Sequence, residues 1–233
     1  MTRFILIGAV LAAAWNCGAA AEAIELNRLI PEVEVHENAK PSPADELGIR
    51  PYLYHGEIGL SLPFRFYAPA AAESNKAPIP MIVWLHGAGS SGFDNHKNVC
   101  MELANRMILE EKTPCSLLFP QYRKEYNWWS YENDDGESKE GIAGSQTLDL
   151  IDEICEHVPT IDSRRIYLIG MSQGAFAIPS FLAAYPNRFA AAVMIAGGQR
   201  GFPEFWSKDE MIPVWVIYSE DDEIAMQGAE ESV

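Results

Sequence analysis

Basic residues are scarce in this chain. It has 17 Lys and Arg against 33 Asp and Glu, and its formal net charge is −16. Such an excess of negative charge repels nucleic-acid phosphates and anionic lipid headgroups. We therefore expect no nucleic acid and no anionic membrane surface among the partners, and we interpret the acidic residues as an ordinary soluble surface.

The chain also lacks an apolar run long enough to cross a bilayer. The N-terminal run, residues 4–14, falls short of the roughly 20 residues that a membrane-spanning helix needs. Arg3 precedes this run and Ala19-Ala20-Ala21 follows it, which is typical of a secretory signal peptide. We expect residues 1–21 to be cleaved, leaving a secreted or periplasmic protein with no stable membrane insertion. A lipid anchor on Cys17 and an uncleaved N-terminal anchor stay open as alternatives.

Cysteines are few, and signal cleavage would leave an odd number of them. Cys100, Cys115 and Cys155 would remain in the mature chain, so at least one thiol stays free or pairs with another molecule. Their spacing has no metal-ligand pattern, and we expect no metal and no organic cofactor.

The remaining sequence is typical of one globular domain, residues 22–233, with 48% hydrophobic residues in the whole chain. Residues 22–75 look irregular, with an antiparallel strand pair at a sheet edge. Strands and helices then alternate, which predicts an α/β fold whose mostly parallel central sheet carries helices on both faces. The expected strands are 52–57, 63–69, 81–85, 116–119, 165–169, 190–196 and 213–218, and the expected helices are 98–111, 141–157 and 173–185.

The most specific motif follows the strand at 165–169. It reads Gly170-Met171-Ser172-Gln173-Gly174, the G-x-S-x-G pattern of a nucleophile elbow between a strand and a helix. Gly170 and Gly174 occupy the two places where a larger side chain would collide. Ser172 is therefore the candidate catalytic nucleophile, held at a helix N-terminus where developing negative charge is stabilised.

A second loop completes this candidate site. His86-Gly87-Ala88-Gly89 directly follows the apolar strand at 81–85. In nucleophile-elbow folds such a loop lies beside the elbow and supplies one oxyanion-hole N–H, while the residue after the nucleophile supplies the other. The backbone N–H groups of Ala88 and Gln173 are the predicted donors. His86 is expected to brace the loop by hydrogen bonding rather than to act as a base.

Carboxylates cluster just after the strand at 213–218. Asp222 stands where the turn returns toward the site, and we take it as the candidate triad acid. Asp221 is the alternative, and a purely solvated acidic turn is also open.

The order of these motifs extends the pattern. The chain reads HGAG-x₄-DN, then FPQ ahead of an aromatic pair, then ID-x-x-RIY-x-x-GMSQGA, then IPVWV-x-x-SEDD. From about residue 60 to its end it resembles the secreted α/β-hydrolases of the phospholipase/carboxylesterase, polyhydroxybutyrate-depolymerase and feruloyl-esterase-like group. The resemblance implies the α/β-hydrolase fold, Ser172 as nucleophile, Asp222 as triad acid and the HGAG loop as oxyanion wall.

Other residues match the group near the mouth of the site. Asp94-Asn95 and Gln121 do so, although we assign them no catalytic role. Gln121, Trp128 and Trp129 form a possible pocket for an acyl or aromatic group. A packed loop is the equally open alternative for the tryptophans.

The resemblance fails at one residue, because the triad order of this group is serine, acid, histidine. All five histidines, His36, His55, His86, His96 and His157, precede Ser172. We expect the sequence to be a fragment that lacks roughly 50 residues of a whole domain. The absent part would contain the last strand, the histidine loop and the closing helix. The alternatives are a substitute base, for which His96 is the best candidate, and a degenerate hydrolase that only binds.

The function implied is a secreted serine carboxylic-ester hydrolase that forms an acyl-Ser172 intermediate on a small-molecule or polymeric ester. The chain as given should have low activity, because it lacks the base. Two alternatives remain: a catalytically dead hydrolase-fold binding protein, and a prolyl-oligopeptidase-like serine peptidase. The strand at 213–218 should form an apolar sheet edge that promotes aggregation.

Overall fold

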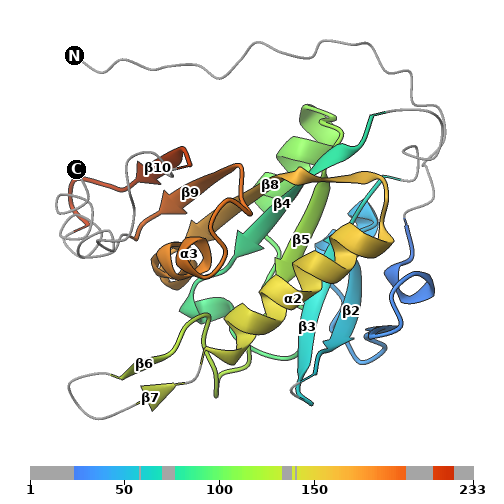
Figure 1. Cartoon of the computed structure of the whole chain (residues 1–233), viewed down its shortest axis with the longest axis horizontal. Coiled ribbons are helices and arrows are strands. Elements are labelled where there is room, and N and C mark those ends of the chain that lie inside the picture. The colour runs from blue at the N-terminus through green and yellow to red at the C-terminus, as the bar shows by residue number, and fades with distance from the viewer. Residues whose placement is uncertain are drawn as a thin grey trace.

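The computed structural model describes residues 24–57, 59–69, 77–132, 138–139, 141–197 and 212–222. The predicted signal peptide, residues 1–21, lies outside these ranges. The described residues form a central sheet with helices packed on it (Figure 1).

The sheet has eight strands in the order β1-β2-β3-β5-β4-β8-β9-β10. Neighbours from β1 to β5 pair antiparallel, and those from β5 to β10 pair parallel. The predicted α/β class is confirmed. The strands are β1 Val33–Val35, β2 Arg50–His55, β3 Ser61–Tyr67, β4 Ile79–Leu85, β5 Ser116–Pro120, β8 Ile161–Met171, β9 Ala191–Ile195 and β10 Val214–Ile217.

The N-terminal strand pair needs one correction. β2 and β3 are antiparallel as predicted, but they do not form the sheet edge, because β1 pairs with β2 and β3 pairs with β5. The sequence did not reveal β1, which has three residues and buries only Val33. So short a strand has no periodicity to detect.

Two core clusters lie on opposite faces of the sheet, because side chains alternate along each strand. In β4, Val83 and Leu85 belong to the larger cluster, whereas Ile82 and Trp84 belong to the smaller one. The continuous apolar run of β4 therefore reflects burial on both faces.

Helices cover both faces. α2, Ile142–His157, and α3, Gln173–Ala184, pack against the larger cluster and cross the front of the sheet in Figure 1. On the other face lie α1, Met101–Asn105, the π-helical turn η5, Arg106–Glu110, and the 3₁₀ turn η2, Pro43–Leu47. The remaining short elements are η1 Leu26–Arg28, η4 Ala88–Ser90, β6 Tyr131–Glu132 and β7 Ser138–Lys139.

The predicted helix at 98–111 begins three residues later than expected. The buried side chain of Asn98 donates to the carbonyl oxygen of Phe119 at 2.6 Å and to the side chain of Asn95 at 3.2 Å. These bonds hold the segment before Met101 in a loop against β5. Asparagine side chains commonly compete with helix formation in this way.

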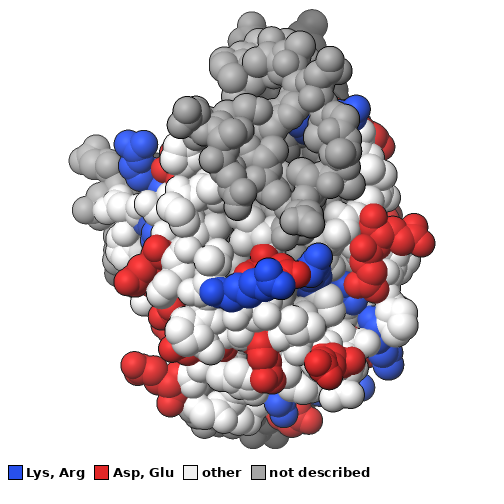
Figure 2. Space-filling model, turned by 90° about the vertical axis from the view of Figure 1, so that its right-hand side faces the viewer, with Lys and Arg blue, Asp and Glu red and all other residues white. Residues whose placement is uncertain are grey.

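The surface agrees with a chain rich in acidic residues. Acidic side chains occur on several sides of the face in Figure 2, and a few basic ones run across its middle. Within the described ranges, no helix has the length and apolarity to cross a membrane. Cys100, Cys115 and Cys155 are all unpaired.

β10 is the last strand of the described sheet, and one of its faces is open. Val214 and Val216 pack against the larger core cluster, whereas the Trp215 side chain is 65% exposed. A large exposed aromatic residue on an edge strand is the kind of feature that promotes strand-to-strand association.

We expect Trp215→Lys to reduce self-association, because it places a charge on this edge. The free energy of unfolding should change by no more than about 0.5 kcal/mol, since the side chain is mostly exposed. Sedimentation velocity and urea unfolding measure the two effects. Val35→Lys is the matched control, because Val35 is 47% exposed on β1 at the opposite edge. Unchanged self-association in Trp215→Lys, or an equal decrease in Val35→Lys, would contradict this prediction.

Candidate active site

Ser172 lies in the turn between β8 and α3 with φ 51° and ψ −120°. A non-glycine residue rarely adopts a positive φ, and such strain persists only where the surroundings hold it. The Ser172 N–H donates to the carbonyl oxygen of Ile195 at 2.8 Å, and its own carbonyl accepts from the Phe176 N–H at 3.0 Å. These bonds hold the backbone of Ser172, whereas the residue itself is exposed to solvent.

The glycines on either side allow three elements to meet. A side-chain carbon at Gly174 would collide with the carbonyl oxygen of Leu85 at the end of β4. One at Gly170 would collide with the backbone of Gly174. Only glycine at both positions lets β4, β8 and the start of α3 approach this closely.

The loop after β4 lies directly against Ser172. A carbon built on Gly87 would stand 3.2 Å from the Ser172 Cβ and 3.7 Å from its Oγ. Ala88 begins η4 and Gln173 begins α3. The N–H groups at the start of a helix have no intrahelical acceptor. Gly87, the residue before Ala88, thus lies against Ser172, and Gln173 follows Ser172 at the positive end of α3.

His86 is a buried, neutral brace. Its Nδ1 hydrogen-bonds to the carbonyl oxygen of Gly87 at 2.7 Å, and its Nε2 accepts from the Tyr122 N–H at 3.4 Å. Because Nε2 accepts, the proton resides on Nδ1. Burial lowers the pKa of His86 to about 4, and the bond to Gly87 opposes this only in part. This geometry suits loop bracing and not proton abstraction.

Two of the three predicted pocket residues, Trp128 and Gln121, hold the loop after β4 by hydrogen bonds to its carbonyl oxygens. The Trp128 indole N–H donates to the carbonyl oxygen of His86 at 3.0 Å, and the ring is buried. Gln121 is also buried, and its amide donates to the carbonyl oxygen of Ser90 at 3.0 Å. Trp129 is half-buried and packs against the larger core cluster.

A buried polar network anchors the far end of the loop. Asn95 donates its backbone N–H to the Gln121 Oε1 at 2.7 Å and offers its carbonyl to the Arg65 Nε at 2.5 Å. Burial raises the pKa of Asp94, but hydrogen bonds from Lys40, Gln121 and the His96 N–H outweigh it and lower the value to about 2. Asp94 and Asn95 are thus structural here.

The candidate acid follows β10. Register places Met171, Ile195 and Ile217 side by side, so the ends of β8, β9 and β10 lie at one edge of the sheet. The Asp222 N–H donates to the carbonyl oxygen of Ser219 at 3.0 Å, which closes the turn there. The Asp221 carboxylate accepts from the hydroxyl of Ser219, and this bond lowers its pKa.

Every histidine in the chain lies within the described residues, and none is hydrogen-bonded to the Ser172 hydroxyl there. Each ring has another hydrogen-bond or ionic partner. The partners are Asn95 for His36, Ser61 and Glu34 for His55, Gly87 and Tyr122 for His86, Pro41 for His96, and Glu153 for His157.

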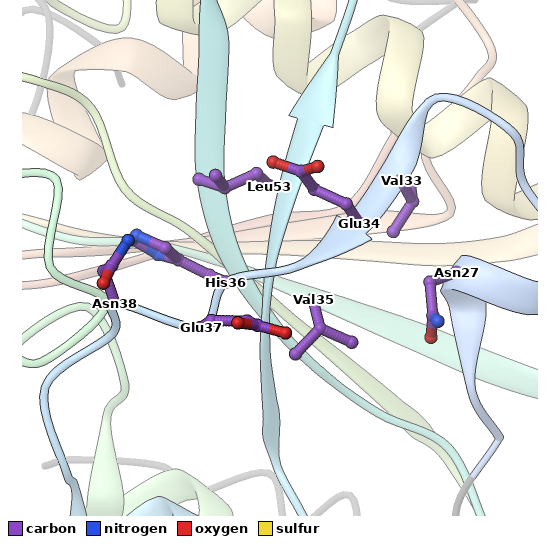
Figure 3. Close-up of a pocket in the computed structure, with 8 residues that line it drawn as sticks. All are labelled: Asn27, Val33, Glu34, Val35, His36, Glu37, Asn38 and Leu53. Carbon is purple, nitrogen blue, oxygen red and sulfur yellow. The ribbon is translucent and has the colours of Figure 1, made fainter.

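A surface hollow lies far from this serine. Residues of η1, β1, β2 and the turn after β1 line it, among them Glu34, His36 and Glu37 (Figure 3). Four strands separate β1 from β8, which corresponds to roughly 24 Å. Across the described part of the chain, no three His, Cys, Asp or Glu side chains cluster as metal ligands.

Comparison with known proteins gives a family. Residues 62–231 match the family described as "Esterase PHB depolymerase". The chain belongs to this esterase family. The match includes the elbow, the oxyanion loop and the acidic turn, so it covers each segment of the candidate site.

Two relatives illustrate the family and its fold. Poly(3-hydroxyalkanoate) depolymerase C of Paucimonas lemoignei is 27% identical over 138 residues, which are 57% of this chain and 30% of that protein. A crystal structure of a thermostable esterase is 26% identical with a TM-score of 0.60, over 78% of this chain and 50% of that one. The chain thus spans half or less of the length of these relatives.

A third similarity concerns the fold alone. A putative dipeptidyl aminopeptidase IV from Bacteroides ovatus aligns with a TM-score of 0.53 at 16% identity, over 78% of this chain and 29% of that one. Together with the sheet order, these neighbours confirm the predicted α/β-hydrolase fold.

No local pattern in the sequence marks Tyr122 as part of this site. The residue follows Gln121 after β5, and β5 is a direct neighbour of β4 in the sheet. Because adjacent parallel strands end at the same edge, whatever follows β5 must lie close to the loop that follows β4. The pairing of β4 with β5 is therefore what places Tyr122 at this loop, and a local sequence pattern does not reveal that pairing.

Gly174→Ala should destabilise the protein by about 1–3 kcal/mol, because the added methyl group must displace the backbone at Leu85. Gly89→Ala is the matched control in the same site, since nothing lies within 4 Å of a carbon built there. Urea unfolding gives the free energy for both variants. Equal stability of Gly174→Ala and wild type would contradict the close approach of β4 and α3.

His86 should make stability depend on pH. Between pH 6.5 and about 4 the unfolded chain protonates this histidine while the folded chain does not, so stability falls as the pH is lowered. The loss should reach about 3 kcal/mol and be fully recovered above pH 6.5. His86→Gln should remove this part of the slope in unfolding measured over pH 4–7.

Gly89→Ala, which leaves every histidine in place and meets nothing within 4 Å, provides the control for this measurement. It should keep the wild-type slope. The pKa of His36 is also lowered by burial and contributes to the slope of every variant, so the difference between variants is the quantity to compare. Parallel slopes for wild type and His86→Gln would contradict the buried neutral state.

Proposed function

We propose that this chain is the core of a serine carboxylic-ester hydrolase acting through an acyl-Ser172 intermediate. The observation that carries the proposal is the exposed Ser172 in its strained turn with Gly87 against it. The family and a depolymerase relative support ester chemistry. The substrate would be a small-molecule or polymeric carboxylic ester.

The chemistry follows from the arrangement. The Ser172 oxygen attacks the ester carbonyl carbon, and its proton passes to a base. The N–H groups of Ala88 and Gln173 stabilise the oxyanion that forms. Collapse of this intermediate expels the alcohol and leaves the acyl-serine ester, which water then hydrolyses. Asp222 would orient the imidazole that serves as base.

The base itself has no candidate after Ser172 in this sequence. Triad members act as a unit, so we propose that these 233 residues retain only the smaller contribution of the oxyanion hole and of substrate binding. We further propose that residues 1–21 direct export, so that the substrate is an ester outside the cell or in the periplasm.

A fluorophosphonate probe tests the nucleophile on the 233-residue chain. We expect slow labelling at Ser172, located by mass spectrometry, and none in Ser172→Ala. Ser180→Ala is the matched control, because Ser180 is an exposed serine on α3. Turnover of p-nitrophenyl acetate should fall far below the roughly 1–10³ s⁻¹ of typical enzymes.

Two outcomes would change this proposal. A Ser172 that never reacts would favour a hydrolase fold that only binds. Turnover at ordinary esterase rates that Ser172→Ala abolishes would mean that one of the five histidines is the base, and His96→Gln would be the first variant to test.

A further inference from the structure

The two oxyanion donors belong to separate segments of the chain. Ala88 lies in the loop after β4, and Gln173 lies at the start of α3. An oxyanion hole works only if its donors are fixed relative to each other before the charge develops. Some contact between the two segments must therefore set their spacing.

Tyr122 makes that contact. Its backbone N–H donates to the Nε2 of His86, and its ring stacks on the His86 imidazole with centroids 4.7 Å apart and planes inclined by 20°. Its hydroxyl donates to the side-chain oxygen of Gln173. Tyr122 thus contacts both segments. Its backbone and ring contact His86, and its hydroxyl contacts Gln173.

The surroundings make this bridge rigid. Tyr122 is 3% exposed, and Trp128 packs edge-on against both its ring, at 4.9 Å, and that of His86, at 5.0 Å. Water has little access to compete for a hydrogen bond in such a place, and leaving one of its groups unpaired is costly. His86 holds its side of the bridge as a neutral acceptor.

We propose that Tyr122 is a positioning residue that joins the His86–Ala88 segment and Gln173 into one oxyanion-binding unit. The proposal rests on the proposed function. Tyr122 acts through its contacts with His86 and Gln173. Without its hydroxyl, the Gln173 amide loses a buried partner, and the first turn of α3 can shift relative to the loop.

Phosphonylation of Ser172 reads out this geometry without a completed triad. The Ser172 Oγ–P bond forms, the P–F bond breaks, fluoride leaves, and the serine proton passes to buffer. The phosphoryl oxygen then takes the place of the oxyanion. Labelling at several concentrations of a fluorophosphonate separates the maximal rate constant from the apparent binding constant.

Tyr122→Phe should lower the maximal rate constant about three- to tenfold, the size expected for one hydrogen bond, with the binding constant unchanged. Gln173→Met keeps the backbone N–H but removes the other end of the bridge, so it should give the same decrease. The double variant should be no slower than either single one. Tyr185→Phe, which removes the hydroxyl of an exposed tyrosine just after α3, should label like wild type.

The outcomes separate the two proposals. If wild type is labelled at Ser172 and Tyr122→Phe is labelled equally fast, the bridge is overturned and the proposed function is not. Additive losses in the double variant, or a loss that follows a decreased melting temperature, also overturn the bridge, because they indicate a merely structural role. A wild-type Ser172 that does not react at all overturns the proposed function, and the bridge with it.

Discussion

The close approach of β4, β8 and α3 is the constraint on which the rest of the site depends. No side chain fits between the start of α3 and the end of β4, so Gly174 is required, and none fits between α3 and β8, so Gly170 is required. This approach fixes Ser172 in a strained turn, and the bond from its N–H to Ile195 ties that turn to β9. The strain is sustained because three packed elements hold it.

A second layer keeps the oxyanion loop in place against that turn. His86, Tyr122 and Trp128 form a buried aromatic group against the loop, and Gln121 binds the carbonyl oxygen of Ser90 and the N–H of Asn95 further along. Buried hydrogen bonds of this kind are costly to leave unmade. Gln121 and Trp128, two of the three predicted pocket residues, thus hold the loop through hydrogen bonds to its carbonyl oxygens.

The opposite end of the site is less enclosed. β10 contributes Asp222 beyond its C-terminal end, at the edge shared with β8 and β9, while Trp215 on the same strand is largely exposed. Each of the five histidines has a hydrogen-bond or ionic partner other than the Ser172 hydroxyl within the described structure. Ser172, the loop from His86 to Gly89 and the turn that contains Asp222 therefore share one edge of the sheet.

Sequence by itself determined the alternation of strands and helices and the elbow at Ser172, because periodicity and glycine spacing are local properties. It also indicated that His86 braces the loop. It could not reveal β1, the start of α1 at Met101 rather than at Asn98, or the bridge at Tyr122. These features depend on which strands are neighbours and on which polar side chains find buried partners. Only the tertiary structure decided them, since β5 and β4 pair across a separation in sequence that no local pattern records.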